Sequence, residues 1–276
     1  MARSVFRRLL GSGAKTVSGK PDGARLREFW NGRYAAFTLS ESGWCGAGEG
    51  LNDRIYACKR QALRKAIAAL GLTRDQRWSV LDAGCGQGHF ARFYREEYPA
   101  SSYVGLDISE RAVSYLRRTI ADTEFHVADL CEWNDPEVRT FDIVQSVEVL
   151  HLILDDDALR GALANLARRV GPRGALLVTA ALPDQTLERS NYLRYRSRAF
   201  WNDAIASLGL RMAAERPMYY WLPAGGPTNK YLRHALTRLG PGVLYAIDRT
   251  AFGLGLPQPA TIGIDSRMRL LTLQRV

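Results

Sequence analysis

The sequence predicts an α/β fold in which a seven-stranded, mostly parallel sheet lies between flanking helices. From Ser79 onward, short apolar or β-branched runs alternate with helical patterns, as in successive βα units. Most of these runs are apolar throughout, which is typical of strands that helices cover on both faces. The length of 276 residues suffices for one such domain with additional segments.

Each element is predicted from its local pattern. Strands are expected at residues 79–83, 103–106, 124–128, 141–147, 175–180, 212–221 and 268–275. Helices are expected, from apolar residues at helical spacing, at residues 26–36, 51–70, 90–97, 111–120, 156–170, 198–208 and 229–239. Gly171-Pro172 and Gly209 end two of these helices.

These elements group into five segments. They are a flexible basic N-terminal arm at 1–24, a helical N-terminal cap at 25–74, a core at 75–222, an insertion at 223–262 and a last core strand at 263–276. The arm is rich in glycine and serine, and the cap contains a glycine-rich loop at 42–50. The insertion, in which residues 243–256 are apolar, is too long for a hairpin. We therefore expect it to cover a pocket or to dock on a surface.

The chain has a formal net charge of +10, which can attract nucleic acid, anionic lipid or an acidic substrate. Its arginines are scattered over every expected helix, so the pattern does not favour nucleic acid as a partner. Peripheral membrane contact could arise through residues 1–10 or 229–256, which combine basic and apolar side chains. No apolar run has the length of a membrane span and the cysteines form no C-x-x-C pair, so a cytoplasmic location is expected. The sequence leaves the oligomeric state open.

A glycine-rich loop follows the first expected strand. The run Val80-Leu-Asp-Ala-Gly-Cys-Gly-Gln-Gly-His-Phe places Gly84, Gly86 and Gly88 between a strand and a helix. Glycines allow a sharp turn and a close approach of the backbone to a ligand. Asp107 ends the next strand, about twenty residues on, where a carboxylate can accept both ribose hydroxyls of a nucleoside. The pattern predicts a ligand that contains a nucleoside.

A dinucleotide is the first alternative for this ligand. In the G-x-G-x-x-G pattern counted from Gly84, however, the last position is His89. Asp82 would also place a negative charge beside a pyrophosphate. S-adenosylmethionine (SAM) carries a sulfonium and an ammonium group and no phosphate, so Asp82 favours this ligand.

Residues 80–130 resemble class I SAM-dependent methyltransferases, which have a Rossmann-like sheet. The matching motifs are D-x-G-x-G-x-G, the second-strand sequence Gly105-Leu-Asp-Ile-Ser and a later acidic loop. The resemblance implies that SAM is the cofactor, with S-adenosyl-L-homocysteine (SAH) as product. The residues it implies in cofactor binding are Asp82, Gly84, Cys85, Gly86, Gly88, Asp107, Ile108, Asp129, Leu130, Ser146 and Val147.

The resemblance also implies roles for some of these residues. Asp82 would orient the methionine end of the cofactor through water, and Asp107 would bind the ribose. Ile108 would flank the adenine, and Asp129 would meet its amino group. Ser146 and Val147 would lie under the methionine moiety.

Residues 141–154 resemble the fourth-strand motif FDxVxxxxVLHH of small-molecule methyltransferases, with Leu152 in place of the second histidine. Glu148 and His151 would then lie near the entry of the methyl acceptor. His151 is the first candidate general base and Glu148 the second, with a hydrogen-bonded structural role as the alternative for each. No N/D-P-P-Y/F motif follows, so the branch that methylates adenine or glutamine amides is not supported.

Candidate acceptor contacts are the aromatic residues Tyr34, Trp44, Tyr192 and Tyr195, with ordinary packing as the alternative. The acidic run at 155–157 could suggest a magnesium site, but acidic residues at the start of a helix are more often caps. The histidines at 89, 126 and 234 have no partner at metal-ligand spacing. No metal site is therefore predicted.

The expected function is SAM-dependent methyl transfer to a small-molecule acceptor. O-methylation of a secondary metabolite, quinone, lipid or sugar is favoured, because the segments around the core suggest a pocket rather than a flat basic surface. Two alternatives remain. They are an RNA methyltransferase, which only the charge supports, and a SAM-binding protein of this fold without methyl transfer.

Overall fold

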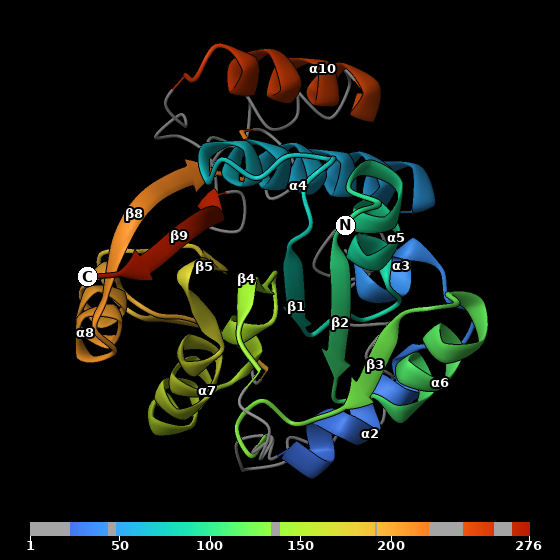
Figure 1. Cartoon of the computed structure of the whole chain (residues 1–276), viewed down its shortest axis with the longest axis horizontal. Coiled ribbons are helices and arrows are strands. Elements are labelled where there is room, and N and C mark those ends of the chain that lie inside the picture. The colour runs from blue at the N-terminus through green and yellow to red at the C-terminus, as the bar shows by residue number, and fades with distance from the viewer. Residues whose placement is uncertain (1–22, 44–47, 134–138, 191, 221–239, 257–266) are drawn as a thin grey trace.

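The computed structural model describes residues 23–43, 48–133, 139–190, 192–220, 240–256 and 267–276. These residues form a seven-stranded sheet in the order β3-β2-β1-β4-β5-β9-β8 (Figure 1). Its strands are β1 Ser79–Ala83, β2 Ser102–Asp107, β3 Glu124–Val127, β4 Phe141–Ser146, β5 Val170–Ala180, β8 Leu210–Pro217 and β9 Arg269–Arg275. The predicted seven-stranded, mostly parallel sheet is confirmed.

The order of the strands determines where a ligand can bind. β1 pairs in parallel with β2 on one side and with β4 on the other, and β5 pairs in parallel with β4. β9 is antiparallel to both β5 and β8. The chain therefore changes direction along the sheet between β1 and β4. In open α/β sheets, ligands bind beyond the carboxyl ends of the strands at such a switch point.

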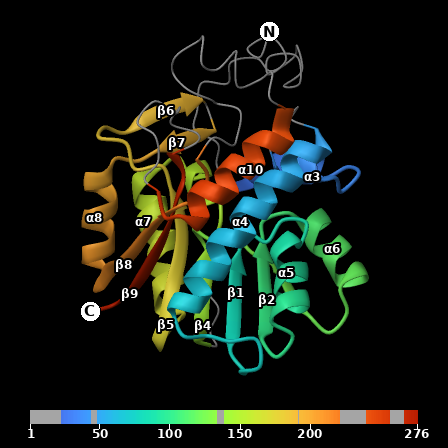
Figure 2. The same cartoon turned by 90° about the horizontal axis from the view of Figure 1, so that it is seen from above.

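Helices cover both faces of this sheet (Figure 2). The described helices are α2 Gly23–Arg33, α3 Leu39–Ser42, α4 Glu49–Ala69, α5 His89–Glu97, α6 Glu110–Thr119, the 3-10 helix η1 Leu150–Leu152, α7 Asp156–Arg168, α8 Arg198–Ser207 and α10 Gly240–Gly253. Apolar side chains of α4, α5 and α6 form a core on one face, and those of α7 and α8 form a second core on the other. α10 packs along α4 (Figures 1 and 2).

Helix α4 has an apolar stripe that explains its position. Ile55, Leu63 and Ile67 are fully buried against the sheet at helical spacing. α4 was predicted as part of an N-terminal cap, and it is also a main helix of the covering layer. By contrast, α2 lies across the edge toward which β2 and β3 point (Figure 1).

Several predicted boundaries were wrong. β5 begins at Val170 rather than at residue 175, because Val170 already pairs with Phe141, and a bulge separates this pair from the ladder that resumes at Ala175 and Ile143. β8 covers Leu210–Pro217 rather than 212–221: Gly209, at φ +65°, turns the chain into it, and Pro217 has no N–H to extend the ladder. The expected arm at 1–24 overlaps α2 by two residues.

Other elements were not predicted. A hairpin of β6 Leu187–Ser190 and β7 Leu193–Tyr195 follows β5. The single turn α3 is held by a capping box of Thr38 and Glu41. The apolar run at 243–256 largely forms α10. The expected helix at 229–239, residues 1–22 and Trp44 lie outside the described residues. Within the described part of the chain, every helix is too short or too polar to span a bilayer.

Candidate active site

The glycine loop after β1 lies at the switch point of the sheet. The N–H groups of Gly84 and Cys85 donate to the carbonyl oxygen of Leu106, at 2.7 and 2.8 Å, which ties the loop to the end of β2. Gly86 has φ +55°, and a Cβ atom there would lie 3.1 Å from the hydroxyl of Tyr34. Glycine adopts this φ without strain and lets the Tyr34 hydroxyl approach the backbone. The main chain of the loop therefore lies directly against Tyr34.

Asp107 is held beside this loop. One carboxylate oxygen accepts a hydrogen bond from the Gly86 N–H at 2.8 Å, and the other accepts from the Ser109 N–H at 2.9 Å. Burial raises the pKa of Asp107 to about 6, although both backbone hydrogen bonds lower it. Each oxygen keeps a second lone pair, so the carboxylate can still accept two hydroxyl groups. The structure thus brings together Gly86 and Asp107, as the motif predicted.

Asp82 lies beneath the loop in the interior of the sheet. Its side chain is 0 % exposed and accepts a hydrogen bond from the hydroxyl of Tyr103. Burial raises the pKa of Asp82 to about 6, against the effect of that hydrogen bond. Its other oxygen, Oδ1, has no well-formed hydrogen bond among the described residues, although the nearby side-chain amide of Gln145 also lowers the Asp82 pKa. A buried acceptor of this kind suits a water-mediated contact, which is the predicted role.

The predicted adenine-side residues lie further along the same edge. Ile108 is half-buried and Leu130 is buried. Asp129 is half-buried, and one of its oxygens accepts from the Cys131 N–H at 3.0 Å. Its other oxygen is so close to Gly23, the first residue of α2, that a Cβ there would lie 2.2 Å away. Helix α2 therefore begins against the predicted adenine contact.

The remaining predicted cofactor residues fix the ends of β1 and β4. The Ser146 hydroxyl donates to the Ala83 carbonyl oxygen at 3.0 Å. Val147 is buried just after it, and Cys85 is buried within the loop. Gly88, at φ +74°, is the N-cap of α5. These residues shape the floor of the site through backbone geometry and packing.

Helix α2 is fixed over the site by a polar contact and an aromatic series. Asn31 Oδ1 accepts from the Ser109 hydroxyl at 2.7 Å and from the Arg111 N–H at 3.2 Å. Successive ring contacts join Tyr192, Phe29, Trp30, Tyr34, Phe37 and Tyr115, with centroids 3.8 to 6.3 Å apart. Tyr34 is buried at the glycine loop, on the cofactor side of the site. Tyr192 contacts the helix from the β6–β7 hairpin.

Glu148 follows β4 in an unusual backbone conformation. Its φ is +59°, and its N–H donates to the Thr179 hydroxyl at 2.7 Å. Its carboxylate pairs with the Lys59 ammonium at 3.0 Å and accepts from the Tyr219 hydroxyl at 2.5 Å. Burial alone would raise the pKa of Glu148, but Lys59, Tyr219 and His151 outweigh it and the pKa is lowered. Glu148 is therefore an anion at neutral pH.

Lys59 and Tyr219 were missed by the sequence analysis. Burial would lower the pKa of Lys59, but Glu148 reverses this and the pKa is raised. A signal was present, since Lys59 occupies the apolar stripe of α4, four residues from both Ile55 and Leu63. A lysine in such a stripe indicates a buried charge with a partner. The sequence around Tyr219 has no comparable pattern that would indicate a buried hydrogen bond to Glu148.

His151 lies in η1, half-buried, with its ring 5.7 Å from that of Tyr195. A small cavity is lined by His151, Thr179 and Tyr195, among other residues. The structure thus brings the two predicted catalytic residues to one side of the site, since Glu148 contacts the same Thr179. Of the predicted acceptor contacts, Tyr195 lies here.

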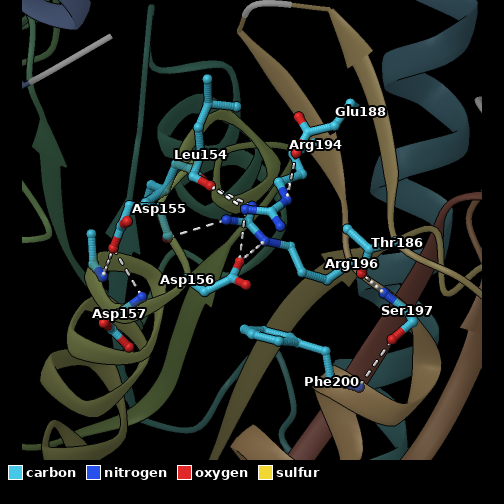
Figure 3. Close-up of polar contacts among 12 residues, drawn as sticks. Leu154, Asp155, Asp156, Asp157, Thr186, Glu188, Arg194, Arg196, Ser197 and Phe200 are labelled. Carbon is cyan, nitrogen blue, oxygen red and sulfur yellow. Dashed lines mark hydrogen bonds and ion pairs between the residues drawn. The ribbon is translucent and has the colours of Figure 1, made fainter. Parts of the chain in front are cut away.

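The β6–β7 hairpin is attached to the start of α7 by charged side chains (Figure 3). Asp156 pairs with Arg194 at 3.1 Å and with Arg196 at 3.0 Å. The neighbouring Asp155 accepts hydrogen bonds from the N–H groups of residues 157 and 158, at 3.0 and 2.9 Å, so its predicted capping role is confirmed. These contacts hold Tyr195 beside His151.

Comparison with known proteins agrees with this geometry. Residues 80–174 match the model of a family described as "Methyltransferase domain". Residues 80–174 therefore carry a methyltransferase domain, and the strand order around the glycine loop is that of the class I fold. This domain contains both the glycine loop and the turn that bears Glu148 and His151.

Curated relatives of the methyltransferase domain include trans-aconitate 2-methyltransferase from Acidovorax sp. (strain JS42). It is 29 % identical over 137 residues, which are 49 % of this chain and 50 % of that protein. The chain thus spans about half the length of such relatives.

Two solved structures share the fold. Magnesium protoporphyrin IX methyltransferase from Synechocystis PCC 6803, with bound SAM, has a TM-score of 0.55 at 16 % identity, over 95 % of this chain and 100 % of that one. A SAM-dependent methyltransferase from Leishmania major has a TM-score of 0.61 at 16 % identity, over 91 % of this chain and 82 % of that one. At these identities the similarity shows the fold of the methyltransferase domain.

Proposed function

We propose that the protein transfers the methyl group of SAM to a hydroxyl group of a small molecule. The observation that carries this proposal is the contact between Asp107 and Gly86. This hydrogen bond joins Asp107, at the end of β2, to the backbone of the glycine loop. Both lie at the switch point of the sheet, where the class I fold binds its ligand.

The residues present fit this cofactor. Asp107 would accept the ribose hydroxyls, and Asp129 would accept a hydrogen bond from the adenine amino group. Oδ1 of Asp82 would reach the methionine end through water. None of these three carboxylates suits a phosphate, whereas each suits a ligand that carries positive charge and hydroxyl donors.

When bound, SAM supplies a methyl group on a sulfonium, whose S–C electron pair stays on sulfur while the acceptor oxygen gains the O–CH₃ bond and loses its proton. The protein's own task is to align the acceptor, exclude water and receive this proton. His151 is the favoured base, because a neutral imidazole can take a proton near pH 7. Glu148 is engaged by Lys59 and Tyr219 and is a weaker base.

A small acceptor is supported by the way the site is covered. Helix α2 and its aromatic series lie over the carboxyl end of the sheet, and a covered site favours an acceptor small enough to enter beneath this helix. Relatives that act on trans-aconitate, a small organic molecule, agree with this size class.

The test is transfer of label from methyl-labelled SAM to a panel of phenols, aliphatic alcohols, amines, trans-aconitate and total RNA. We expect label in a small alcohol or phenol, and loss of this transfer near pH 7 in His151→Ala. Label only in RNA would contradict the small-molecule proposal. Tight SAM binding without any transfer would instead favour a SAM-binding protein of this fold.

A further inference from the structure

Lys59, Glu148 and Tyr219 form a buried polar group beside the switch point. They come from α4, from the turn after β4 and from the segment after β8. Both oxygens of the Glu148 carboxylate are engaged, one by the Lys59 ammonium at 3.0 Å and one by the Tyr219 hydroxyl at 2.5 Å. The Lys59 ammonium also lies 4.4 Å from the centre of the Tyr56 ring. Binding of the cofactor, as proposed above, uses none of these three groups.

The members of this group differ in exposure. The Lys59 side chain is 3 % exposed and the Glu148 side chain is 18 % exposed. Tyr219 is 1 % exposed. The carboxylate is therefore the member that faces open space, while the ammonium and the phenol lie behind it. A ligand that reaches these three side chains contacts the Glu148 carboxylate first.

The backbone at Glu148 also indicates function. A residue with a Cβ atom is disfavoured at φ +59°, and such outliers persist where the surroundings hold them, often at ligand sites. Here the hydrogen bond from the Glu148 N–H to Thr179 holds the turn. The same Thr179 lines the small cavity beside His151, so the turn directs Glu148 and His151 to one side of the site.

We propose that Glu148 is the acceptor-binding residue of this enzyme, a fixed anion that accepts a hydrogen bond from an acceptor hydroxyl or ammonium and disfavours an acceptor carboxylate there. Lys59 and Tyr219 are positioning residues that keep the carboxylate ionised and oriented. This inference rests on the proposed methyl transfer and specifies its substrate class. The lowered pKa of Glu148 agrees with it, because a weak base binds the acceptor without removing its proton.

The proposal goes against one property of the curated relatives, whose named substrate, trans-aconitate, is an anion. The expected preference for a hydroxyl or an ammonium over an anion follows from the charge of Glu148. An anionic acceptor at Glu148 would have to overcome like-charge repulsion beside a largely buried carboxylate, where charges interact more strongly than in water. A hydroxyl or an ammonium would instead donate a hydrogen bond to the same carboxylate.

The experiment uses the full chain saturated with SAH and three probes that share one ring: benzylamine, benzyl alcohol and benzoate. Saturation-transfer NMR titration gives the affinity of each probe. For the wild type we expect benzylamine to bind at least about tenfold more tightly than benzoate, with benzyl alcohol between them, since a direct contact with a partly exposed carboxylate, weakened by Lys59 behind it, is worth about a factor of ten. In Glu148→Gln, this difference should shrink to about twofold.

Two further variants separate recognition from folding. Tyr219→Phe keeps the ring and removes one hydrogen bond to the carboxylate, so the preference for benzylamine over benzoate should weaken, but less than in Glu148→Gln, because Lys59 still pairs with the carboxylate. Lys65→Met, on the same helix, removes an ammonium that contacts the Phe252 carbonyl oxygen, outside this group, and should leave the probe preference unchanged. Unchanged SAH affinity in every variant would show that the site is intact.

The outcomes distinguish this inference from the proposed function. A wild type that fails to bind SAH contradicts the proposed function itself. With SAH bound, equal or tighter binding of benzoate, binding of no probe, or an unchanged preference in Glu148→Gln overturns only the assignment of Glu148.

Discussion

The proposed cofactor side and the proposed acceptor side of this site are built in different ways. On the cofactor side, the glycine loop and Asp107 lie within one stretch of the chain, and backbone N–H groups make the decisive contacts. On the acceptor side, Glu148 contacts residues 89 and 71 positions away in the sequence, and side chains make the contacts. One side depends on conformation that glycine permits, and the other on charges that must neutralise each other.

This difference determines what each side tolerates. The glycine loop is sensitive to any added Cβ atom, but it contains no buried ion pair that a substitution could break. A side-chain site can lose one partner only at the cost of an unpaired buried charge. The acidic groups differ as well, because burial raises the pKa of Asp107 whereas Lys59 and Tyr219 lower that of Glu148.

The largest effect on stability is expected on the acceptor side, for Lys59→Met. This change leaves the buried Glu148 carboxylate without its counter-ion and should lower the free energy of unfolding by about 3 kcal/mol. Urea unfolding followed by circular dichroism measures it. The double variant Lys59→Met/Glu148→Gln should recover most of the loss, because no unpaired charge remains. A single variant no less stable than Lys65→Met would show that the pair contributes little.

A somewhat smaller effect is expected on the cofactor side, for Gly86→Ala. The left-handed φ of +55° costs a residue with a Cβ about 1–2 kcal/mol, and the new methyl group would crowd the Tyr34 hydroxyl. The affinity for SAM should fall together with the stability of the fold. The matched control is Gly161→Ala in α7, where nothing lies within 4 Å of the new Cβ and helix propensity should raise stability slightly. Unchanged SAM affinity in Gly86→Ala would mean that the ligand does not approach this backbone.

The pH dependence should have opposite signs for binding and for stability on the cofactor side. Asp82 and Asp107 have pKa values of about 6 in the folded protein, against an ordinary value of 3.8. Between pH 6 and 4 the folded protein therefore binds protons that the unfolded chain does not, and these two groups raise stability as the pH falls. SAM binding needs ionised Asp107, so its affinity should fall about tenfold from pH 7 to pH 5.

Calorimetry at pH 5, 6 and 7 checks this expectation. Asp82→Asn should retain the fall in affinity if Asp107 is the group that controls binding. An affinity that is constant over this range would contradict the assignment of Asp107 as the ribose ligand.

The smallest effect is expected away from both sides, for Asp155→Ala. Loss of this N-cap of α7 should lower the free energy of unfolding by about 1 kcal/mol. Thermal unfolding with and without SAH measures it. The SAH affinity should remain that of the wild type, and a large loss of affinity would show that the start of α7 is coupled to the cofactor.

The geometry of the glycine loop and Asp107 could be predicted from the sequence because it depends on local contacts. Three glycines between a strand and a helix, followed by Asp107 at the end of the next strand, determine the backbone geometry with few contributions from elsewhere. The central strands β1, β2, β4 and β5 could be predicted for a related reason, since buried parallel strands are rich in apolar residues.

The acceptor side could not be predicted to the same extent. Tyr219 lies near a strand end with no marker of its partner, and the β6–β7 hairpin has no regular alternation of apolar and polar residues. That hairpin is fixed by Arg194 and Arg196 on Asp156, a contact between segments that local patterns do not reveal (Figure 3). Lys59 in the apolar stripe of α4 was the one usable signal.

The central claim is that the glycine loop and Asp107 form the SAM site. Calorimetry of SAM with the wild type and with Asp107→Ala tests it most directly. The account predicts binding by the wild type and about a 100-fold loss in the variant, because two charge-assisted hydrogen bonds to the ribose disappear. Equal affinity of the two proteins, or no binding by a folded wild type, would contradict it.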